Sequence, residues 1–389
     1  MERFETIVLG LGAMGAATAY RLARRGNRVL GIDRHSPPHV HGSTHGDTRI
    51  TRLGIGEGAQ YTPLAMRSHE LWREMERETG ATLLTTHGGL VLSSTTKSSR
   101  SHSETFFANT VAAAKQYDIP HEIMDAGEIR RRFPPFIVAD DEMGYFEPSA
   151  GFVRPEACVS VQLALAQQHG AQLHRGERVT AFDASDGGVT VATDRGNYAA
   201  DRLVVTAGPW LPEFVGPSIG RHLSIYRQVL CWFDIDGPVE PYLPENFPVF
   251  IWELQGKRQG IYGFPAINGA RGGLKTATEQ YDATTTPDAA DSEVSATEIQ
   301  VIHSEYVQPF LRGLRSTCVR AASCLYTVTP DFGFIIDAMP GAERVLVASP
   351  CSGHGFKHSA AIGEALAERV IDGASRLDLG AFALSRFAE

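Results

Sequence analysis

Residues 4–15 of the chain read FETIVLGLGAMG, and this stretch decides the fold of the N-terminal part. An apolar run that contains β-branched residues leads into closely spaced glycines, and the alanine-rich residues 16–25 follow. Gly26 suits the left-handed residue that ends a helix, and residues 28–32 read as a second strand that closes on Asp33. The pattern predicts strand, glycine turn, helix and strand, the βαβ unit of dinucleotide-binding proteins.

The glycines and the acid of this unit each have a predicted task. Gly10 permits the tight turn, Gly12 lets the backbone approach a pyrophosphate, and Gly15 lets the helix pack on the strand. Free N–H groups at the helix start would face the phosphates, and Asp33 would accept hydrogen bonds from a ribose. An acid there repels a 2′-phosphate, which favours FAD or NAD over NADP, although the adjacent Arg34 keeps NADP open.

Length and composition bound the remaining possibilities. At roughly 150 residues per domain, 389 residues fit two domains. With 43% hydrophobic and 21% charged residues, the chain has the composition of an ordinary globular protein, which excludes disorder, collagen and coiled coil. The net charge of −9 supplies no basic field for nucleic acid or an anionic membrane, so neither is an expected partner.

The cysteines indicate a reducing compartment. Five are scattered along the chain without a C-x-x-C pair, and no metal site is implied. The N-terminus has no basic segment followed by an apolar stretch, and there is no run of about 18 apolar residues. We therefore expect a cytoplasmic protein that is neither secreted nor membrane-spanning.

Beyond the βαβ unit, the chain departs from the regular alternation of a nicotinamide dehydrogenase. The polar residues 35–58 form a long loop, and a loop of this length is usually functional. The region 221–262 changes to strands rich in aromatics, Pro and Gly, which predicts a second domain. Further predicted elements are helices at 62–79, 155–168, 293–311 and 357–371, strands at 172–179, 189–193, 201–206 and 345–348, and a glycine-rich loop at 351–356.

Five blocks of sequence carry a family resemblance. They are GLGAMG at 10–15, GSTHGDTR at 42–49, YGFP at 262–265, CLYT at 324–327 and SGHGFK at 352–357. Together they resemble the monomeric sarcosine oxidase and N-methyltryptophan oxidase family, FAD-dependent amine oxidases of the glycine oxidase and D-amino acid oxidase superfamily. The blocks occur in the family's order, and the resemblance extends from residue 4 to about residue 372.

The resemblance implies a mixed α/β fold in which a Rossmann-like FAD-binding domain is interleaved with a substrate domain rich in β-sheet. The FAD domain would comprise residues 1–88, 150–220 and 325–389, and the substrate domain residues 89–149 and 221–324. The flavin ring would lie at their junction, and the protein would be a monomer.

The resemblance also implies covalent FAD, joined through a thioether from Cys324 to the flavin 8α-methyl group. Attachment needs a thiolate, so a nearby cation would help to lower the thiol pKa; the other four cysteines read as inert thiols. The small residues that end strand 201–206 would let backbone pass close to the cofactor, although a plain turn explains them equally well. The predicted cofactor residues are Gly10, Gly12, Ala13, Met14, Gly15, Asp33, Arg34, Ser43, Thr44, Thr48, Arg49, Val179, Ala207, Gly208, Cys324, Gly353, His354, Gly355, Phe356 and Lys357.

Three cations have predicted roles. Arg49 and Arg52 are three residues apart, and on an extended loop this spacing sends their side chains to opposite faces. The family pattern assigns Arg49 to the flavin side and Arg52 to the substrate carboxylate, which a guanidinium can bind through both oxygens. Lys357 begins the last helix, where a cation needs an anion to offset the helix dipole. The resemblance places it beside the flavin pyrimidine edge and the same carboxylate.

The remaining predicted site residues concern catalysis and substrate choice. Lys275 matches a family lysine that lies near flavin N5 and promotes the reaction with O₂. Tyr262 and Tyr326 would form aromatic walls of the active site; the alternative is that both pack in the core. The family commonly has an active-site histidine four residues after that lysine, where this chain has Glu279. That glutamate would either line the cavity or turn to solvent or to an arginine.

The expected function is FAD-dependent oxidation of a secondary amine, an N-methyl amino acid of the sarcosine or N-methyltryptophan type. O₂ would be the acceptor, and the products would be the amino acid, formaldehyde and H₂O₂. Oxidation of a cyclic or primary amino acid, as with pipecolate or glycine, is the first alternative. A flavin-binding protein without turnover and a nicotinamide-dependent dehydrogenase are further alternatives.

Overall fold

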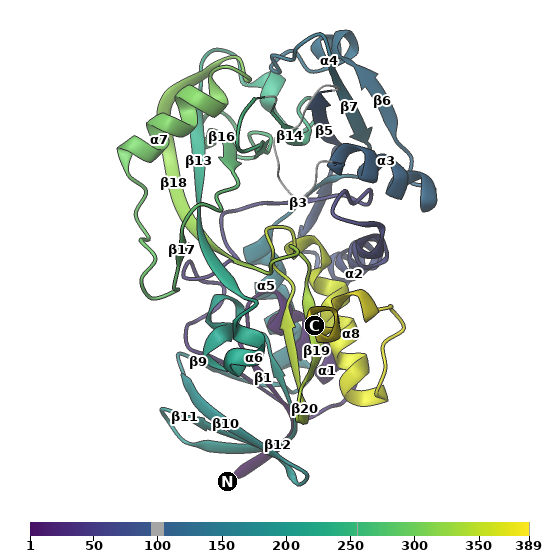
Figure 1. The fold of residues 1–389 in the computed structure, drawn as a ribbon, viewed down its shortest axis with the longest axis vertical. Coiled ribbons are helices and arrows are strands. Elements are labelled where there is room, and N and C mark those ends of the chain that lie inside the picture. The colour runs from purple at the N-terminus through teal and green to yellow at the C-terminus, as the bar shows by residue number, and fades with distance from the viewer. Residues whose placement is uncertain (95–104, 255, 389) are drawn as a thin grey trace.

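The computed structural model describes residues 1–94, 105–254 and 256–388, and its helices and strands form two main β-sheets (Figure 1). The predicted mixed α/β class is confirmed. Within the described residues, no helix has the length and apolar character needed to cross a membrane.

The eight-stranded sheet lies in the lower half of Figure 1. Its order is β10-β11-β12-β1-β2-β9, with β20 paired to β12 and β19 to β20. The β1, β2, β9, β12 and β20 strands run parallel, the arrangement typical of dinucleotide-binding sheets. The strands are β1 (Glu2–Leu9), β2 (Val29–Asp33), β9 (Gln172–Arg175), β10 (Val179–Ser185), β11 (Gly188–Thr193), β12 (Asn197–Val205), β19 (Ile335–Met339) and β20 (Ala342–Ser349).

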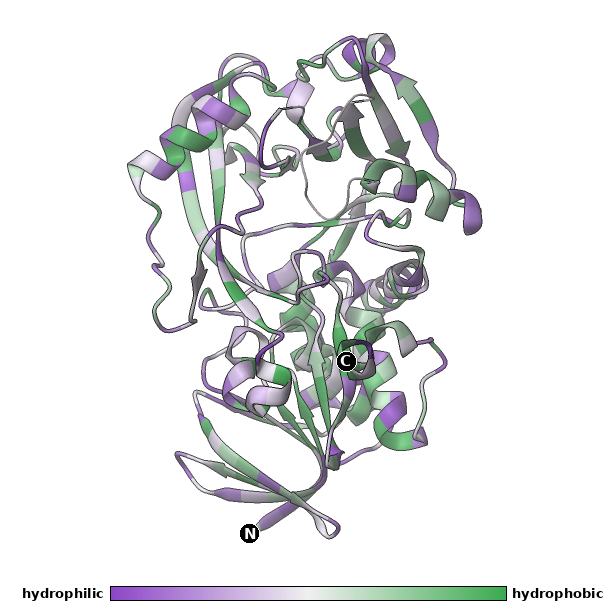
Figure 2. Cartoon of the chain, viewed as in Figure 1, coloured by the Kyte–Doolittle hydropathy of each residue, from purple (hydrophilic) through white to green (hydrophobic). Residues whose placement is uncertain are grey.

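Both faces of this sheet are buried, because successive side chains of a strand point to opposite faces. Val8 and Val204 pack under the helices, whereas Ile7 and Leu203 pack in a separate core on the other face. Figure 2 shows hydrophobic residues concentrated along these central strands and helices. The helices on the first face are α1 (Ala13–Arg24), α2 (Thr62–Thr79), α5 (Pro155–Gln168) and α8 (Ser359–Asp372); α1 contacts both α5 and α8.

The nine-stranded sheet lies in the upper half of Figure 1. Its order is β17-β13-β16-β15-β14-β5-β7-β6, with the long β18 paired to β13. The strands are β5 (Gly89–Ser94), β6 (Glu122–Asp125), β7 (Glu142–Glu147), β13 (Ser224–Ile235), β14 (Val249–Glu253), β15 (Ile261–Gly263), β16 (Leu274–Thr278), β17 (Thr284–Thr285) and β18 (Leu314–Val328). One large apolar core, with Phe136, Phe250 and Trp252 fully buried, belongs to this half.

Smaller elements connect and cover the sheets. A three-stranded sheet contains β3 (Arg49–Thr51), β8 (Gly151–Val153) and β4 (Leu84–Thr86). The shorter α-helices are α3 (Phe106–Gln116), α4 (Ala126–Arg132), α6 (Gly216–Gly220) and α7 (Ala296–Ile302), and a π-helical turn spans His303–Val307. Short 3₁₀ turns span Ala59–Tyr61, Gly208–Glu213, Glu240–Tyr242, Ala270–Gly272, Phe356–His358, Gly380–Phe382 and Leu384–Phe387.

The structure corrects two predicted elements. The helix expected at 293–311 is the short α7 followed by the π-helical turn; it begins late because Ser295 and Glu298 form a capping box. The strand expected at 172–179 is interrupted after β9, since Gly176 has a φ of 66° and turns the chain before β10.

The chain alternates between the two sheets. Strands of the eight-stranded sheet come from residues 2–33, 172–205 and 335–349, and those of the nine-stranded sheet from 89–147 and 224–328. The domain boundaries expected from the family resemblance stay a prediction, and their segments include residues 95–104, 255 and 389, which lie outside the described part.

Candidate active site

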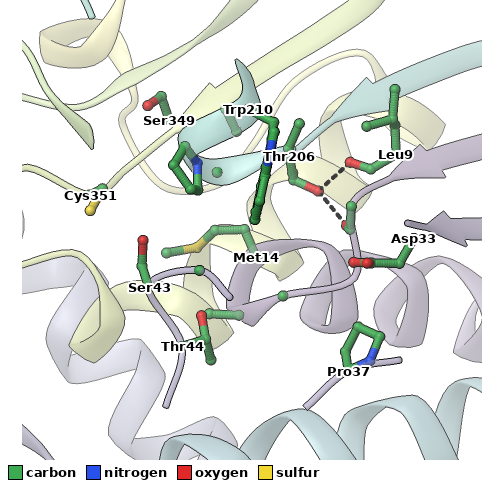
Figure 3. A pocket seen from close by; sticks show the side chains of 18 of the residues that line it. Leu9, Met14, Asp33, Pro37, Ser43, Thr44, Thr206, Trp210, Ser349 and Cys351 are labelled. Atoms are coloured by element: carbon green, nitrogen blue, oxygen red, sulfur yellow. Dashed lines mark hydrogen bonds between the residues drawn. The ribbon is translucent and has the colours of Figure 1, made fainter. Parts of the chain in front are cut away.

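The larger cavity, of about 1300 Å³, lies where β1, β2 and β12 end and α1 begins. Figure 3 shows Ser43 and Cys351 toward one end of it and Asp33 and Pro37 toward the other. Fifteen of the predicted cofactor residues line it: Gly10, Gly12, Ala13, Met14, Asp33, Arg34, Ser43, Thr44, Arg49, Val179, Ala207, Gly208, Gly353, Gly355 and Phe356.

The glycine turn has the geometry that a dinucleotide site needs. Gly10 has a φ of 85°, and a Cβ there would lie 2.6 Å from the carbonyl oxygen of Thr206. A Cβ at Gly15 would lie 1.7 Å from the Gly10 oxygen, so only glycine lets α1 approach β1 this closely. A Cβ at Gly12 would meet Thr44 Oγ1 alone, at 3.7 Å, and this glycine lines the cavity. The start of α1 carries no acidic side chain, so its N–H groups are available to phosphates.

Asp33 ties together two segments beside the cavity. Its Oδ2 accepts the Leu11 N–H at 2.7 Å and its Oδ1 accepts the His35 N–H at 2.7 Å. Burial raises the pKa of this carboxyl. The neighbouring Arg34 places its guanidinium 4.9 Å from the Trp210 ring centroid and 3.3 Å from Asp288. Arg34 is thus engaged by an aromatic ring and an acid.

Five predicted cofactor residues, all within the described part, do not line this cavity. Gly15 packs α1 on β1, His354 and Lys357 line the neighbouring cavity, and Thr48 contacts Lys275. Cys324 is buried on β18; burial raises its thiol pKa, and the charges of Arg49 and Lys275 oppose that effect. Two cations, Arg49 and Lys275, therefore favour the thiolate as expected, but burial has the larger effect on the thiol pKa.

A second cavity, of about 770 Å³, adjoins the first. Arg49, Tyr326, Gly353 and Phe356 line both. The seven residues predicted for catalysis and substrate binding all line the second cavity: Arg49, Arg52, Tyr262, Lys275, Glu279, Tyr326 and Lys357. The structure therefore brings together, from five separate stretches of sequence, the side chains assigned to one site.

Glu57 also lines the second cavity, and the sequence did not indicate a role for it. Its carboxylate lies 2.6 Å from the Arg52 guanidinium and 3.5 Å from the Lys357 ammonium, and all three side chains are at most 6% exposed. Burial lowers the pKa of Lys357 to about 8, and Glu57 limits the fall. Two buried cations thus share one carboxylate in the wall of the cavity.

Lys275 is held by the loop that carries Arg49. Its Nζ donates to the carbonyl oxygens of Gly46 and Thr48, at 2.7 and 2.8 Å, and to Thr48 Oγ1 at 3.3 Å. These three acceptors match the three N–H groups of an ammonium. Burial, with Arg49 as a secondary cause, lowers the Lys275 pKa well below its usual value. Arg49 itself donates to the carbonyl oxygens of Thr48 and Ser43.

Two tyrosines that line the second cavity meet at their hydroxyl groups. Tyr262 Oη and Tyr326 Oη are 3.3 Å apart, and burial raises the pKa of both phenols, so they stay protonated at neutral pH. Glu279 lines the cavity as well, half-buried, and its charge acts on both tyrosines and on Lys357. Of its two predicted positions, the structure places Glu279 at the cavity.

Some lining residues carried no sequence signal. Trp210 and Cys351 line the larger cavity, and Phe106 and Trp252 line the smaller one. Each comes from a segment that reads as ordinary core or turn. Among the described residues, no cluster of His, Cys, Asp and Glu could hold a metal ion.

The family described as "FAD dependent oxidoreductase" matches residues 5–369, nearly the whole chain. The chain belongs to this family. FAD is therefore the cofactor, and the match favours a flavoprotein over the nicotinamide-dependent alternative. The phosphate-facing turn and the buried Asp33 fit this dinucleotide.

Named relatives of this flavoprotein match over their full length. The monomeric sarcosine oxidase of Streptomyces avermitilis is 39% identical over 386 residues, which cover 99% of this chain and 98% of the relative. The N-methyl-L-tryptophan oxidase of Escherichia coli K12 is 36% identical over 388 residues, with 99% and 100% covered.

Solved structures share the fold of the flavoprotein. A Tyr258Phe mutant of NikD, described as an unusual amino acid oxidase, has a TM-score of 0.86 at 24% identity, with 98% of this chain and 97% of that chain covered. Glycine oxidase from Geobacillus kaustophilus has a TM-score of 0.73 at 19% identity, with 99% of each chain covered. At these identities the likeness concerns the fold alone.

Proposed function

We propose that the protein oxidises the C–N bond of an N-methyl amino acid with O₂ as electron acceptor. Hydrolysis of the resulting imine would release the amino acid and formaldehyde, and the reduced oxygen would leave as H₂O₂. The observation that carries this proposal is the Glu57 carboxylate shared by Arg52 and Lys357 in the cavity wall. A site that already holds one carboxylate between two buried cations suits the carboxylate of an amino acid.

The relatives support the N-methyl substituent. Their names specify sarcosine and N-methyl-L-tryptophan, and the identity extends over almost the whole chain. When bound, FAD supplies the acceptor for the two electrons of the amine and the donor for O₂. The fifteen lining residues named above would hold it, with the ring placed where the two cavities share Arg49 and Tyr326.

The side chains of the second cavity would divide the remaining work. Arg52 and Lys357 would bind the carboxylate after Glu57 yields to it. Tyr262 and Tyr326 would line the space around the amine as neutral phenols, since their raised pKa values keep them protonated. Lys275 would stabilise the negative charge that develops on O₂.

We also propose that Cys324 forms the thioether to the flavin. The CLYT block supports it, as do the charges of Arg49 and Lys275, which favour the thiolate against burial. A cytoplasmic location is proposed as well, supported by five cysteines that are all free. A monomer is also proposed, supported by the name of the monomeric sarcosine oxidase relatives. Size-exclusion chromatography with light scattering would test the monomer.

Two measurements test the function. The visible spectrum of purified protein should show flavin bands that stay with the polypeptide after acid precipitation. Peroxide release should then be followed with sarcosine, bulkier N-methyl amino acids, pipecolate and glycine. Turnover of N-methyl amino acids supports the proposal, whereas peroxide from pipecolate or glycine alone would replace it with the cyclic or primary amino acid alternative.

Glu279 would set a preference among substrates. Its negative charge beside Lys357 would offset part of the cationic field and repel a second anionic group. We expect poor turnover of N-methylaspartate relative to sarcosine, and a relative gain for N-methylaspartate in Glu279→Gln. An unchanged substrate ranking in that variant would remove Glu279 from substrate selection.

A further inference from the structure

Two thiols meet at an irregular step in the β13–β18 ladder, outside the active site. The ladder pairs Trp232 with Arg320 and then Phe233 with Cys318, so Val319 is an extra residue on β18. Side chains alternate between the faces of a strand, and a bulge of this kind moves the following residue to the other face. The extra residue therefore transfers Cys318 from the Trp232 face to the face of Cys231 and Phe233.

The two thiols differ in their surroundings. Cys231 is fully buried in the core of the nine-stranded sheet, and Cys318 packs at the edge of that core, partly exposed. The two side chains share a face of the ladder and lie near enough for each to act on the pKa of the other. As a thiol, Cys318 also donates to the Arg320 carbonyl oxygen at 2.8 Å.

Their mutual influence distinguishes the two sulfurs chemically. The neighbouring Cys231 is the main cause that lowers the pKa of Cys318 to about 7, with backbone groups of Trp232 and Arg320 adding to the effect. The neighbouring Cys318 and burial raise the pKa of Cys231. The ladder thus places a buried, protonated Cys231 on the same face as the accessible Cys318, which is partly ionised at neutral pH, the arrangement of a reactive thiolate beside a resolving thiol.

We propose that Cys318 and Cys231 are a peroxide-reactive pair that H₂O₂ converts to an intrachain disulfide. The supply of H₂O₂ rests on the proposed function; the reactivity of the pair does not. In the first step the Cys318 thiolate attacks one peroxide oxygen, the O–O bond breaks, and the departing hydroxide takes a proton to leave as water. Cys318 is then a sulfenic acid.

In the second step Cys231 loses its proton and its sulfur attacks the Cys318 sulfur. The S–O bond breaks, a second water leaves, and the S–S bond forms. Together, two thiols and one H₂O₂ give one disulfide and two waters, so the thiols lose two electrons and the peroxide gains them. Because the partner thiol lies on the same face of the ladder, resolution should outpace further oxidation of Cys318.

The test uses purified holoenzyme treated with reagent H₂O₂ in the absence of any amine. After alkylation under denaturing conditions, peptide mapping without reductant should recover the Cys231 and Cys318 peptides linked, and dithiothreitol should separate them. Cys158, a fully buried thiol in a different core, is the internal control and should stay alkylatable. Wild-type protein in which both cysteines stay alkylatable, or in which Cys318 becomes sulfinic acid without linkage, would overturn the proposal.

Two variants sharpen the assignment of roles. In Cys231→Ser, Cys318 should be trapped as a sulfenic acid by dimedone and should proceed to sulfinic acid. In Cys318→Ser, Cys231 should stay reduced. Oxidation of Cys231 in that variant at the wild-type rate would contradict Cys318 as the attacking thiol.

A final arm separates this proposal from the proposed function. Turnover of an N-methyl amino acid should form the same linkage, and catalase should suppress it. If reagent peroxide links the pair but no amine yields peroxide, the thiol pair stands and the proposed function fails. If turnover releases peroxide but neither source forms the link, the function stands and the thiol pair fails.

Discussion

Glu57 is expected to compete with the substrate carboxylate for Arg52 and Lys357. Its carboxylate is 2.6 Å from Arg52 and 3.5 Å from Lys357, and the side chains are 4–6% exposed, so water screens these contacts little. A carboxylate ligand that occupies both cations must break them. Glu57→Gln removes the competing charge while it keeps the size of the side chain.

The size of the effect follows from the contact that the ligand must break. A hydrogen bond to a charged group contributes about 1.5–3 kcal/mol. Ligand binding to the variant breaks no charged hydrogen bond of this kind. A monocarboxylate such as acetate should therefore bind the variant roughly 10- to 150-fold more tightly than it binds the wild type. In the absence of ligand, the buried cations lose their counter-ion, and unfolding should become easier by about 3–5 kcal/mol.

Calorimetric titration of the holoenzyme with acetate at pH 6.5 would measure the change. Lys357 has its pKa lowered to about 8, and loss of Glu57 lowers it further, so pH 6.5 keeps the ammonium charged in the wild type and favours the charged form in the variant. Glu57→Asp, which keeps the charge, is the matched control and should bind acetate close to the wild-type affinity. Equal or weaker binding of acetate to Glu57→Gln would refute the competition.

Other changes test the remaining roles. Cys324→Ala should keep the fold but abolish flavin that co-migrates with the polypeptide on a denaturing gel; fluorescence that persists on the mutant band would rule out this attachment point. Lys275→Met should slow flavin reoxidation by O₂ far more than anaerobic reduction by substrate, and equal losses in the two half-reactions would contradict its role with oxygen. Acetate binding should weaken as the pH rises through about 8, because Lys357 loses its proton there, and should lose this dependence in Lys357→Met.

The local chemistry of the chain accounts for what the sequence could predict. The glycine turn was predictable because the positions that require glycine, for a positive φ or a close backbone approach, all fall within residues 10–15. They can be recognised without knowing how the rest of the chain folds. The helices at 62–79 and 155–168 have the predicted bounds, since each begins with a proline in its first turn. The polar stretch 35–58 was predicted to be functional, and it contributes residues to both cavities.

Non-local pairing accounts for the rest. Glu57 stands between two glycines in a loop, and its importance appears only when the 3₁₀ turn Phe356–His358 brings Lys357 to it. The placement of Cys231 and Cys318 on one face depends on one extra residue in the ladder, between cysteines 87 positions apart in the sequence, and no local pattern marks that step. The family resemblance supplied the roles of the cavity residues, whereas composition and periodicity did not.

The loop that carries Arg49 and Arg52 shows why the site needs both sheets. Glu156 of α5 accepts the Gly46 N–H at 2.6 Å, and Lys275 of β16 donates to the Gly46 carbonyl oxygen at 2.7 Å. Further along, Glu147 of β7 accepts the Leu53 and Gly54 N–H groups at 2.8 and 2.9 Å. This polar segment, whose regular structure is limited to the short strand β3, is thus held by partners from each half of the molecule. The positions of the two arginines therefore depend on contacts with elements from both halves of the molecule, which the alternation of the chain between the two sheets brings together.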